Sequence, residues 1–232
     1  MIRYKALFLS LIFVFLSIPI SAQNFFSTEK AQKFFSIGAR IGVNATNHTF
    51  NPNYFNRWNV NSWGSGFEAG VVATLSFRDY LAVQPGIFFE SRTGNYAYAT
   101  DYITNLQTSD TFTQMGHSRF YDVVIPIMAV IRFNVSSNVR WLVEAGPYGQ
   151  INIQRPDADN IQVLERLPLV NDYTVFRASS HFYDYGIKIG SGLMFAEHFY
   201  FGIHYLAGLR EVWGQPAGGK NKAWTFTLGY DF

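Results

Sequence analysis

The chain contains no cysteine among its 232 residues. This absence excludes a disulfide framework, a thiolate metal site and a lipid anchor on an acylated cysteine. Charged residues are also scarce, at 15% of the chain. Beyond the amino-terminus, no apolar run approaches the roughly 20 residues that a membrane-spanning helix needs. The sequence therefore excludes both a cysteine-based scaffold and a helical membrane protein.

The amino-terminus has the organisation of a secretory signal peptide. Arg3 and Lys5 precede an uncharged apolar run over residues 6–20, and small residues follow as far as Ala22. The alternative is a membrane anchor, for which a run of 15 residues is short. We predict a signal peptide over 1–22, cleaved after Ala22, and a single mature domain over 23–232.

Cleavage would also remove the excess of positive charge. The chain has 18 basic and 16 acidic residues, and loss of Arg3 and Lys5 leaves 18 − 2 = 16 of each. A nucleic-acid-binding protein needs a clustered excess of Lys and Arg, which the mature chain lacks. We therefore expect no nucleic-acid partner.

Aromatic residues are abundant, at 18% of the chain, and many of them alternate with small or polar residues. This alternation has the period of a β-strand. Four long connections, near 45–65, 97–118, 154–181 and 211–221, alternate with three tight turns. The same alternation of long and short connections is typical of an even-stranded outer-membrane barrel with both termini in the periplasm. The predicted strands are Phe34 to Asn44, Gly66 to Phe77, Tyr80 to Tyr96, Arg119 to Val135, Val139 to Ile153, Phe182 to Phe195, Phe199 to Arg210 and Lys222 to Phe232.

The two faces of these strands differ in charge. One face is apolar, as in Ile37, Ala39, Ile41 and Val43. A basic residue facing lipid at mid-bilayer costs about 2–4 kcal/mol, so the charged face must line the lumen. We predict an all-β fold, an eight-stranded antiparallel transmembrane β-barrel with long extracellular loops and short periplasmic turns. The residues of its lumen charge network are Arg40, Glu68, Glu90, Arg92, Asp122, Arg132, Arg140, Glu144, Asp184, Lys188, His204, Arg210 and Asp231.

The formal charges of this lumen are balanced, with six basic and six acidic residues besides His204. An eight-stranded barrel is only wide enough for side chains to fill, and opposite charges can pair across it. Inward glycines leave room for the long charged side chains. We therefore predict a side-chain-filled polar lumen, in which His204 is hydrogen-bonded and is not a metal ligand.

Several of these strands carry a family resemblance. The segments 86–90, 122–133, 143–148, 184–192 and 205–209 read GIFFE, DVVIPIMAVIRF, VEAGPY, DYGIKIGSG and YLAGL. Together they resemble the porin-family outer-membrane barrels of Bacteroidetes, often labelled PorT-like. The likeness covers most of the mature chain outside the long loops, although Gly86-Ile87 stands where the family often has Glu-Leu. It implies a role in type IX protein secretion for a few members only.

Three further groups of residues are candidates for function. Tyr230 and Phe232 end the last strand and are the expected signal for the barrel-assembly machinery. Ser179, Ser180, His181 and Asp184 form a Ser/His/Asp set, although a cluster of polar loop residues explains them more simply. The first long loop has a composition that suits sugar stacking, or else a lid over the barrel mouth. Its aromatic residues are Phe50, Tyr54, Phe55, Trp58 and Trp63.

The expected function is structural or surface-binding, through the extracellular loops of an outer-membrane protein. The alternatives are a PorT-like accessory of type IX secretion, a small-solute porin and an outer-leaflet lipid-modifying enzyme. We assign no catalytic, cofactor-binding or metal-binding residue. The expected partners are outer-membrane lipid and lipopolysaccharide, the barrel-assembly machinery, and a secretion-system component or surface ligand.

Overall fold

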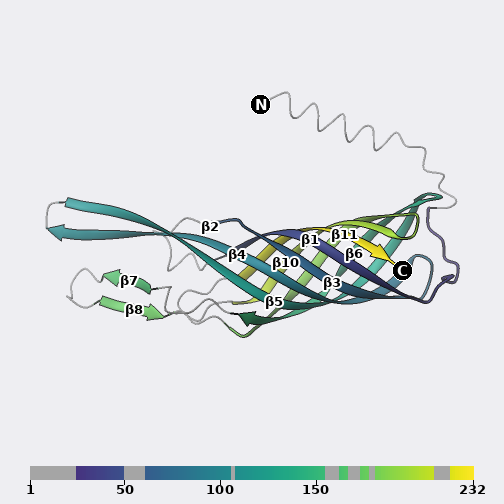
Figure 1. Ribbon diagram of the computed structural model, residues 1–232, viewed down its shortest axis with the longest axis horizontal. Helices are drawn as coiled ribbons and strands as arrows, with labels where there is room; N and C mark the ends of the chain where they lie inside the picture. Colours follow the sequence, from purple (N-terminus) through teal and green to yellow (C-terminus); the bar gives the residue numbers. More distant parts are fainter. Residues whose placement is uncertain are drawn as a thin grey trace, which may run out of the picture.

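The computed structural model describes residues 25–49, 61–105, 108–154, 162–166, 173–177, 181–211 and 220–232. Eight long strands form a closed antiparallel barrel, as the sequence predicts (Figure 1). They are β1 Phe35–Thr49, β3 Gly64–Ser76, β4 Leu81–Asn105, β5 Thr108–Ser136, β6 Val139–Gln154, β9 Tyr183–Phe195, β10 Phe199–Glu211 and β11 Lys220–Asp231. Three short strands lie outside the barrel wall, namely β2 Asn61–Ser62, β7 Gln162–Arg166 and β8 Tyr173–Arg177.

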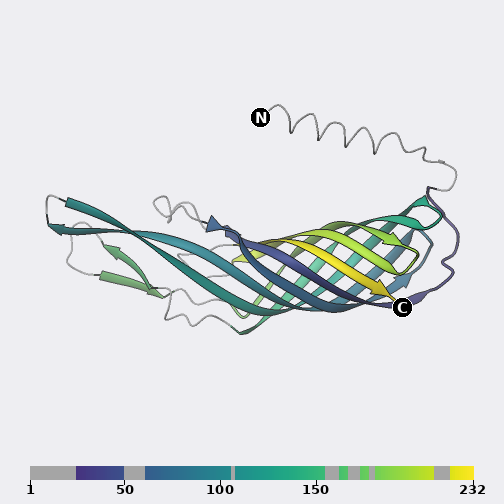
Figure 2. The ribbon, with the colours of Figure 1, turned by 45° about the horizontal axis from the view of Figure 1, so that its top comes forward.

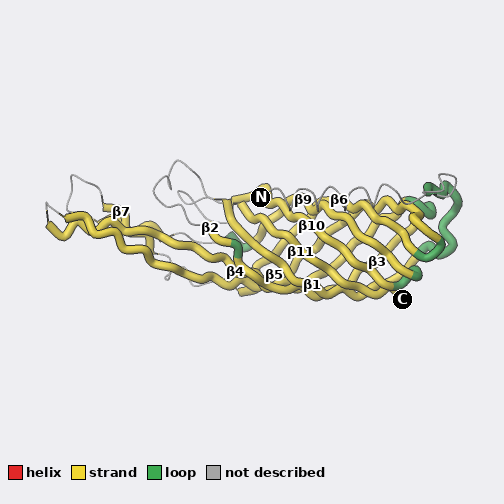
Figure 3. The backbone as a smooth tube through the Cα atoms, turned by 90° about the horizontal axis from the view of Figure 1, so that it is seen from above, coloured by secondary structure: helices red, strands yellow, loops and turns green. Residues whose placement is uncertain are grey.

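The barrel closes because its first and last strands pair with each other. β11 pairs with β1 from Gly38 opposite Asp231 to Thr49 opposite Lys220. Around the wall the order is β1, β3, β4, β5, β6, β9, β10 and β11. Wall strands that follow one another along the chain are therefore adjacent in the barrel. The strands cross the wall obliquely, which is the tilt that closure requires (Figure 3). Closure leaves no edge strand within the wall.

The short turns and the carboxy-terminus lie at one end of the barrel (Figure 2). These turns span residues 77–80, 137–138 and 196–198. In the last of them Ala196 and Glu197 have positive φ angles of 48° and 63°, which complete a tight reversal between β9 and β10. By the predicted topology this is the periplasmic end.

At the opposite end, the structure differs from the loops that the sequence predicts. Residues 97–118 were expected to be a loop, but β4 continues to Asn105 and β5 begins at Thr108, and these two segments pair with each other. This segment has strand-forming residues without a lipid-facing apolar set, so period-two hydrophobicity does not detect it. β1 also continues past Asn44 to Thr49, and β7 and β8 pair within the expected 154–181 loop.

Alternation along each strand separates a lipid-facing surface from the interior. On β1, Ile41 and Val43 are 62% and 61% exposed. Arg40, which precedes Ile41 and faces the other way, is 3% exposed. Aromatic rings form contacts around the outside, such as Phe67 with Phe89 at the outer end, whose ring centroids are 6.1 Å apart. Among the described residues, no helix is long and apolar enough to span a bilayer.

The segment before β1 follows the periplasmic rim of the barrel. The ring of Phe25 stacks on Phe133 with centroids 5.1 Å apart, and the ring of Phe26 lies 4.4 Å from that of Tyr80. Backbone bonds fix the same path, since the Asn134 N–H donates to the Phe25 carbonyl. This contact could not be predicted from local sequence patterns, because it joins residues more than fifty positions apart.

Candidate functional site

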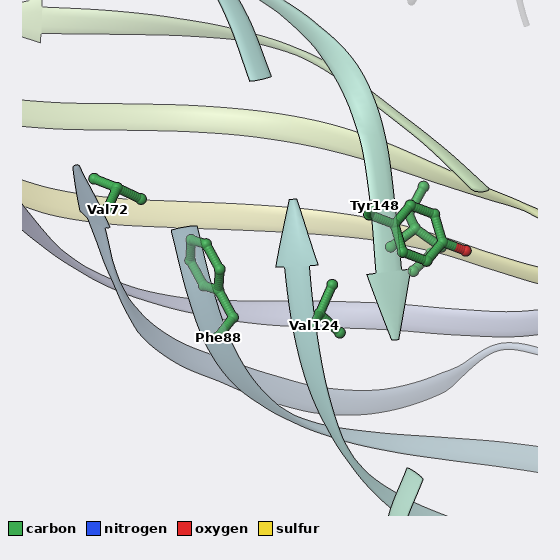
Figure 4. Close-up of a cluster of buried hydrophobic side chains, with 6 residues drawn as sticks. Val72, Phe88, Val124 and Tyr148 are labelled. Atoms are coloured by element: carbon green, nitrogen blue, oxygen red, sulfur yellow. The ribbon is translucent and has the colours of Figure 1, made fainter. Parts of the chain in front are cut away.

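The interior of the barrel is filled by side chains of both kinds, apolar and charged. Two apolar clusters occupy it, one toward each end. The outer cluster is drawn in Figure 4 and consists of Val72, Phe88, Val124, Tyr148, Leu206 and Ala223. The periplasmic cluster consists of Ala82, Met128, Val130, Leu142, Met194 and Tyr200. Sequence reasoning assigned only charges and glycines to the lumen and missed these residues, although their inward phase was readable.

Arg92 is the centre of the outer charge cluster. Its Nη2 lies 2.6 Å from Oε2 of Glu90, and its Nε donates to the same oxygen at 2.7 Å. Nη1 donates to Oε1 of Gln150 at 2.7 Å, and Nε lies 3.8 Å from Oδ2 of Asp122. All three charged groups are at least 97% buried. Glu90 and Asp122 are directly opposite each other on β4 and β5, and the single guanidinium lies close to both of these like charges.

Asp184 of β9 is the third buried carboxylate at the outer end of the lumen. Its Oδ2 accepts from the Asn221 side chain at 2.7 Å and from the Tyr148 hydroxyl at 3.3 Å, and its Oδ1 accepts from the backbone N–H of Tyr185. The neutral donors come from β6 and β11, so this carboxylate links strands that are not adjacent. Buried carboxylates are stabilised by such donors even without a basic partner.

A second cluster lies nearer the periplasmic end. Arg40 forms an ion pair with Asp231 and places its guanidinium carbon 4.5 Å from the centre of the Tyr200 ring. The Tyr200 hydroxyl donates to Oε2 of Glu144 at 2.8 Å, and His204 Nε2 lies 2.6 Å from the same oxygen. Four strands, β1, β11, β10 and β6, are thereby joined through the lumen.

Glycines make these contacts possible where the two partners are on next-but-one strands. Glu144 and His204 are both opposite Gly190 of β9. Glu68 and Thr227 are likewise both opposite Gly42 of β1, and the Thr227 hydroxyl donates to Glu68 Oε1 at 2.6 Å. In each case the side chains meet above a residue that has none. A Cβ at Gly190 would contact the His204 ring at less than the normal van der Waals distance.

Three of the predicted basic residues lie away from the centre of the lumen. Arg132 donates to the Ser76 hydroxyl at 3.0 Å, and Arg140 lies 3.4 Å from Asp79 and 3.1 Å from Glu197 at the periplasmic mouth. Arg210 is half-buried near the outer end of β10, and its Nη1 atom is buried. Its guanidinium carbon lies 3.8 Å from the ring centre of Tyr183, an outward-facing residue of the outer rim. The pairing of β10 with β11 shifts register between Ala207 and Glu211.

The space left in the middle of the lumen is small. Arg40, Glu68, Glu144, Lys188, Tyr200 and His204 are among the residues that line a cavity of about 20 Å³. This volume accommodates about one water molecule. Lys188 contributes to filling it, with Nζ 3.7 Å from Glu68 Oε2 and 4.9 Å from the ring centre of Phe88. Within the described ranges, no group of three His, Asp or Glu side chains has a geometry that could hold a metal ion.

The structure describes only some of the other residues that the sequence suggests for function. Phe50, Tyr54, Phe55 and Trp58 lie outside the described residues, as do Ser179 and Ser180. Trp63 is exposed beside the start of β3, and Tyr230 and Phe232 face outward at the periplasmic rim with their ring centroids 5.2 Å apart. Between the described residues His181 and Asp184, the candidate base and orienter of a triad, the structure shows no hydrogen bond or ion pair. The His181 carbonyl accepts from Asn152, while Asp184 is occupied by Asn221 and Tyr148 inside the lumen.

The β4–β5 hairpin is the second candidate site. Beyond Thr93 and Arg119, eleven further residue pairs join the two strands, from Gly94 opposite Ser118 to Asn105 opposite Thr108. At about 3.4 Å per residue the twelve positions of β4 span roughly 40 Å. Figures 1 and 3 show this hairpin extending well past the end of the barrel. Only the two residues of β2 pair with its outer edge among the described strands, opposite Asn95 and Tyr96.

A closed eight-stranded barrel with a charged interior and an apolar, aromatic exterior defines an outer-membrane β-barrel protein. The sequence profile of the family described as "Outer membrane protein beta-barrel domain" matches residues 22–213, so the chain belongs to this family. No curated protein matches the sequence.

Solved structures of small outer-membrane barrels are similar to this chain in fold. Ail of Yersinia pestis has 10% identity and a TM-score of 0.38, over 86% of this chain and 100% of that one. Neisserial surface protein A has 10% identity and a TM-score of 0.46, over 86% and 98%. The outer membrane enzyme PagL has 12% identity and a TM-score of 0.39, over 82% and 98%.

Proposed function

We propose that this protein is a surface-binding barrel, in which a closed membrane-embedded scaffold holds the β4–β5 hairpin above the outer membrane. The observation that supports this function is the hairpin itself, which extends for eleven residue pairs beyond the barrel wall. The scaffold has a filled interior, with a central cavity of about 20 Å³. A filled interior supports rigid presentation of the hairpin more than it supports transport of solutes.

The edges of the hairpin provide a mode of binding. From Ala97 to Asn105 on β4, and from Thr108 to Ser118 on β5, the outer side of each strand has no partner among the described strands. Such an edge presents a row of backbone donors and acceptors that an extended peptide can pair with. Natural proteins protect exposed edges with lysine or proline, and the sequence from 94 to 118 contains neither.

The charge of the hairpin indicates which peptides fit. Residues 94–118 include Asp101 and Asp110 and no Lys or Arg. Asp101 is opposite Thr111 and Asp110 is opposite Tyr102, so the two acids occupy successive positions of the ladder. Like charges disfavour the pairing of two copies of this hairpin, whereas a peptide with basic side chains is attracted. The partner is therefore an extended, basic, strand-forming segment of another protein.

A peptide-binding assay tests this function in neutral detergent micelles. The probe is a twelve-residue peptide that alternates threonine with lysine, and the matched control peptide has proline at every second threonine. We expect binding of the first peptide, with protection of amide hydrogens over 97–105 or 108–118, and at least tenfold weaker binding of the second. Equal binding of the two would show simple charge attraction and overturn strand addition.

Two variants localise the binding. One replaces residues 97–115 with Asn-Gly, which joins Tyr96 to Gly116 at positions already opposite each other. The other removes the β7–β8 hairpin and is the control. Loss of binding in the first variant alone is expected, whereas loss in neither would overturn the assignment. Asp101→Asn with Asp110→Asn should weaken binding of the lysine peptide while the barrel keeps its heat-dependent gel mobility.

Planar-bilayer recordings test the closed scaffold separately. We expect no stable porin-sized conductance from the purified protein. Steady conductance would instead favour the solute-porin alternative, because the paired lumen charges would then line a channel.

The remaining alternatives have less support in the structure. Segments such as Asp122 to Phe133 resemble PorT-like barrels, and copurification with secretion components would favour a type IX accessory role. An outer-leaflet enzyme would use His181, and its activity should be lost on His181→Ala. We retain the proposal of a signal peptide over 1–22 and of assembly through Tyr230 and Phe232, which a mature amino-terminal sequence and a Phe232→Ser assembly assay would test.

A further inference from the structure

The strand pairing of the barrel wall is interrupted in three neighbouring ladders, which join β3 to β4, β4 to β5 and β5 to β6. Each interruption leaves out two residue pairs, and one member of these pairs is a proline. The ladders of β6 with β9 and of β9 with β10 have no such gap. The pairs left out are Ala73 with Pro85, Thr74 with Gln84, Gly86 with Pro126, Ile87 with Ile125, Ile127 with Pro147 and Met128 with Gly146.

The three prolines, Pro85, Pro126 and Pro147, form what we call the proline seam. Proline has no backbone N–H, so each gap lacks a ladder hydrogen bond that another residue would supply. Pro126 lies between Tyr121 of the outer aromatic contacts and Phe133 of the periplasmic ones, which places the seam in the hydrocarbon region. A carbonyl that lacks a donor there has no water to turn to. Local opening of the wall therefore breaks fewer backbone bonds at the seam than in an uninterrupted ladder.

The inner side of the proline seam borders the central cavity of the lumen. Gln84, Pro126 and Met128 belong to the interrupted pairs, and all three are among the residues that line this cavity. The residues opposite Pro126 and Met128 are Gly86 and Gly146, which have no side chain to add to the wall. A single layer of side chains therefore separates the interrupted ladders from the cavity.

Met128 is the adaptable member of this layer. It is buried, and its unbranched side chain has three rotatable bonds, which lets methionine fill a gap in more than one way. The cavity of about 20 Å³ holds about one water molecule as it stands. A change of the Met128 rotamer enlarges it, so the cavity can accept a ligand somewhat larger than water.

The cavity offers hydrogen-bond acceptors to such a ligand. Glu68 and Glu144 line it and are almost completely buried. Among the described residues, Oε2 of Glu68 and Oε1 of Glu144 have no hydrogen-bond partner, and Nζ of Lys188 is 3.7 Å from the Glu68 oxygen. A buried acceptor without a donor is costly, so a ligand that donates a hydrogen bond is favoured here. A ligand that reaches the seam through hydrocarbon must also be uncharged.

We propose that the wall opens locally at the proline seam and admits small uncharged hydrogen-bond donors, such as alcohols, from the bilayer to the central cavity. This lateral route requires no open channel along the barrel axis. The inference does not depend on the function of the β4–β5 hairpin, because it uses the membrane-embedded part of the wall and a different ligand.

A single introduced thiol tests the route, because the chain has no cysteine of its own. Met128→Cys places the thiol at the inner side of the seam. Met194→Cys is the matched control, since Met194 is also buried in the lumen but lies on β9, whose ladders are uninterrupted. In lipid vesicles, methyl methanethiosulfonate, which is small and uncharged, should label Met128→Cys much faster than Met194→Cys. The analogue that carries a trimethylammonium group should label both proteins slowly.

Restoring the missing donors should close the route. Pro85→Val with Pro147→Val introduces two N–H groups at positions on the lipid-facing side of the wall. Each restored bond should make local opening about fivefold rarer, so labelling of Met128→Cys should slow roughly 30-fold. Labelling of Met194→Cys should be unchanged by the same substitutions. Heat-dependent gel mobility shows which proteins are folded, and Pro147→Val alone, with about fivefold slowing expected, replaces the double variant if that protein does not fold.

Two isomers test the class of ligand, since 1-butanol has a hydroxyl donor and diethyl ether has none. 1-Butanol should slow the labelling of Met128→Cys at a concentration at which diethyl ether does not. Equal protection by the two would overturn the preference for a donor. Labelling of Met128→Cys that is unchanged by the proline substitutions, or equally fast with the charged analogue, would overturn the lateral route and show entry through a mouth of the barrel.

Discussion

Glu144 on β6 and His204 on β10 meet at 2.6 Å across the intervening strand β9, directly above Gly190. Neither strand is adjacent to the other in the wall, so the contact exists only because position 190 has no side chain. The same arrangement joins Glu68 to Thr227 above Gly42. Glycine thus sets which lumen side chains can meet, and the charge network depends on these gaps as much as on the charges.

Gly190→Ala should therefore destabilise the barrel. The added methyl group would overlap the His204 ring, and overpacking of a filled interior costs about 1–3 kcal/mol. Gly149→Ala on β6 is the matched control, because nothing lies within 4 Å of the position that its Cβ would take. It should be neutral or should raise stability slightly, since alanine costs less entropy than glycine in a strand. Urea unfolding in micelles measures both, and equal effects would contradict the role of the gap.

The sequence predicted the parts of this fold that depend on a local period. Alternation of Ile41 and Val43 with Arg40 set the phase of β1, and the cost of a charge in lipid then fixed which face is the lumen. The meeting of Glu144 with His204 was not predictable, because it requires the register of three strands at once. The register shift in β10 was not predictable either, since it cannot be read from hydrophobic alternation.

Arg92→Leu should cause one of the larger losses of stability available to a single substitution. It would leave Glu90 and Asp122 buried and opposite each other without a cation. Removing one partner from a buried ion pair costs about 3–5 kcal/mol. Arg140→Leu removes a partly exposed pair at the mouth and should cost at most about 1 kcal/mol.

A second substitution tests the reason for that loss. If uncompensated charge causes it, adding Glu90→Gln to Arg92→Leu should restore part of the stability. Urea titrations give the free energy of unfolding of the unmodified protein, of Arg92→Leu, of Glu90→Gln and of the double variant, and these four values are compared. A further loss in the double variant would show instead that Glu90 stabilises the barrel through contacts independent of Arg92.

Replacing Phe25 and Phe26 with serine should release the segment that precedes β1 without opening the barrel. The rings contact Phe133 and Tyr80, and each aromatic pair contributes about 0.5–1.5 kcal/mol. Local opening should become roughly 30-fold more frequent, so trypsin should cut at Lys30 faster by a similar factor. Thr28→Ala, at an exposed position of the same segment, is the control and should leave the cleavage rate unchanged. Unchanged cleavage in the serine variant would show that backbone bonds alone hold the segment.

Trp141 and Ser191 form a hydrogen bond on the lipid-facing surface, with the indole N–H 2.7 Å from the serine hydroxyl oxygen. Neither group can turn to water in the hydrocarbon region, so each depends on the other for a partner. Trp141→Phe should therefore cost about 1–2 kcal/mol, because it leaves the serine hydroxyl in lipid with its indole donor removed. Ser191→Ala removes the acceptor of the indole N–H and should cost a similar amount of stability.

The double variant distinguishes this hydrogen bond from simple loss of ring area. If the bond is responsible, Trp141→Phe with Ser191→Ala should be more stable than the sum of the single effects predicts, by about 1 kcal/mol. Reversible unfolding in lipid vesicles is the measurement to use, because a micelle admits water to the barrel surface and would hide the cost. Strictly additive losses would mean that the two groups find other partners in the membrane, and that Trp141 stabilises the barrel through its ring alone.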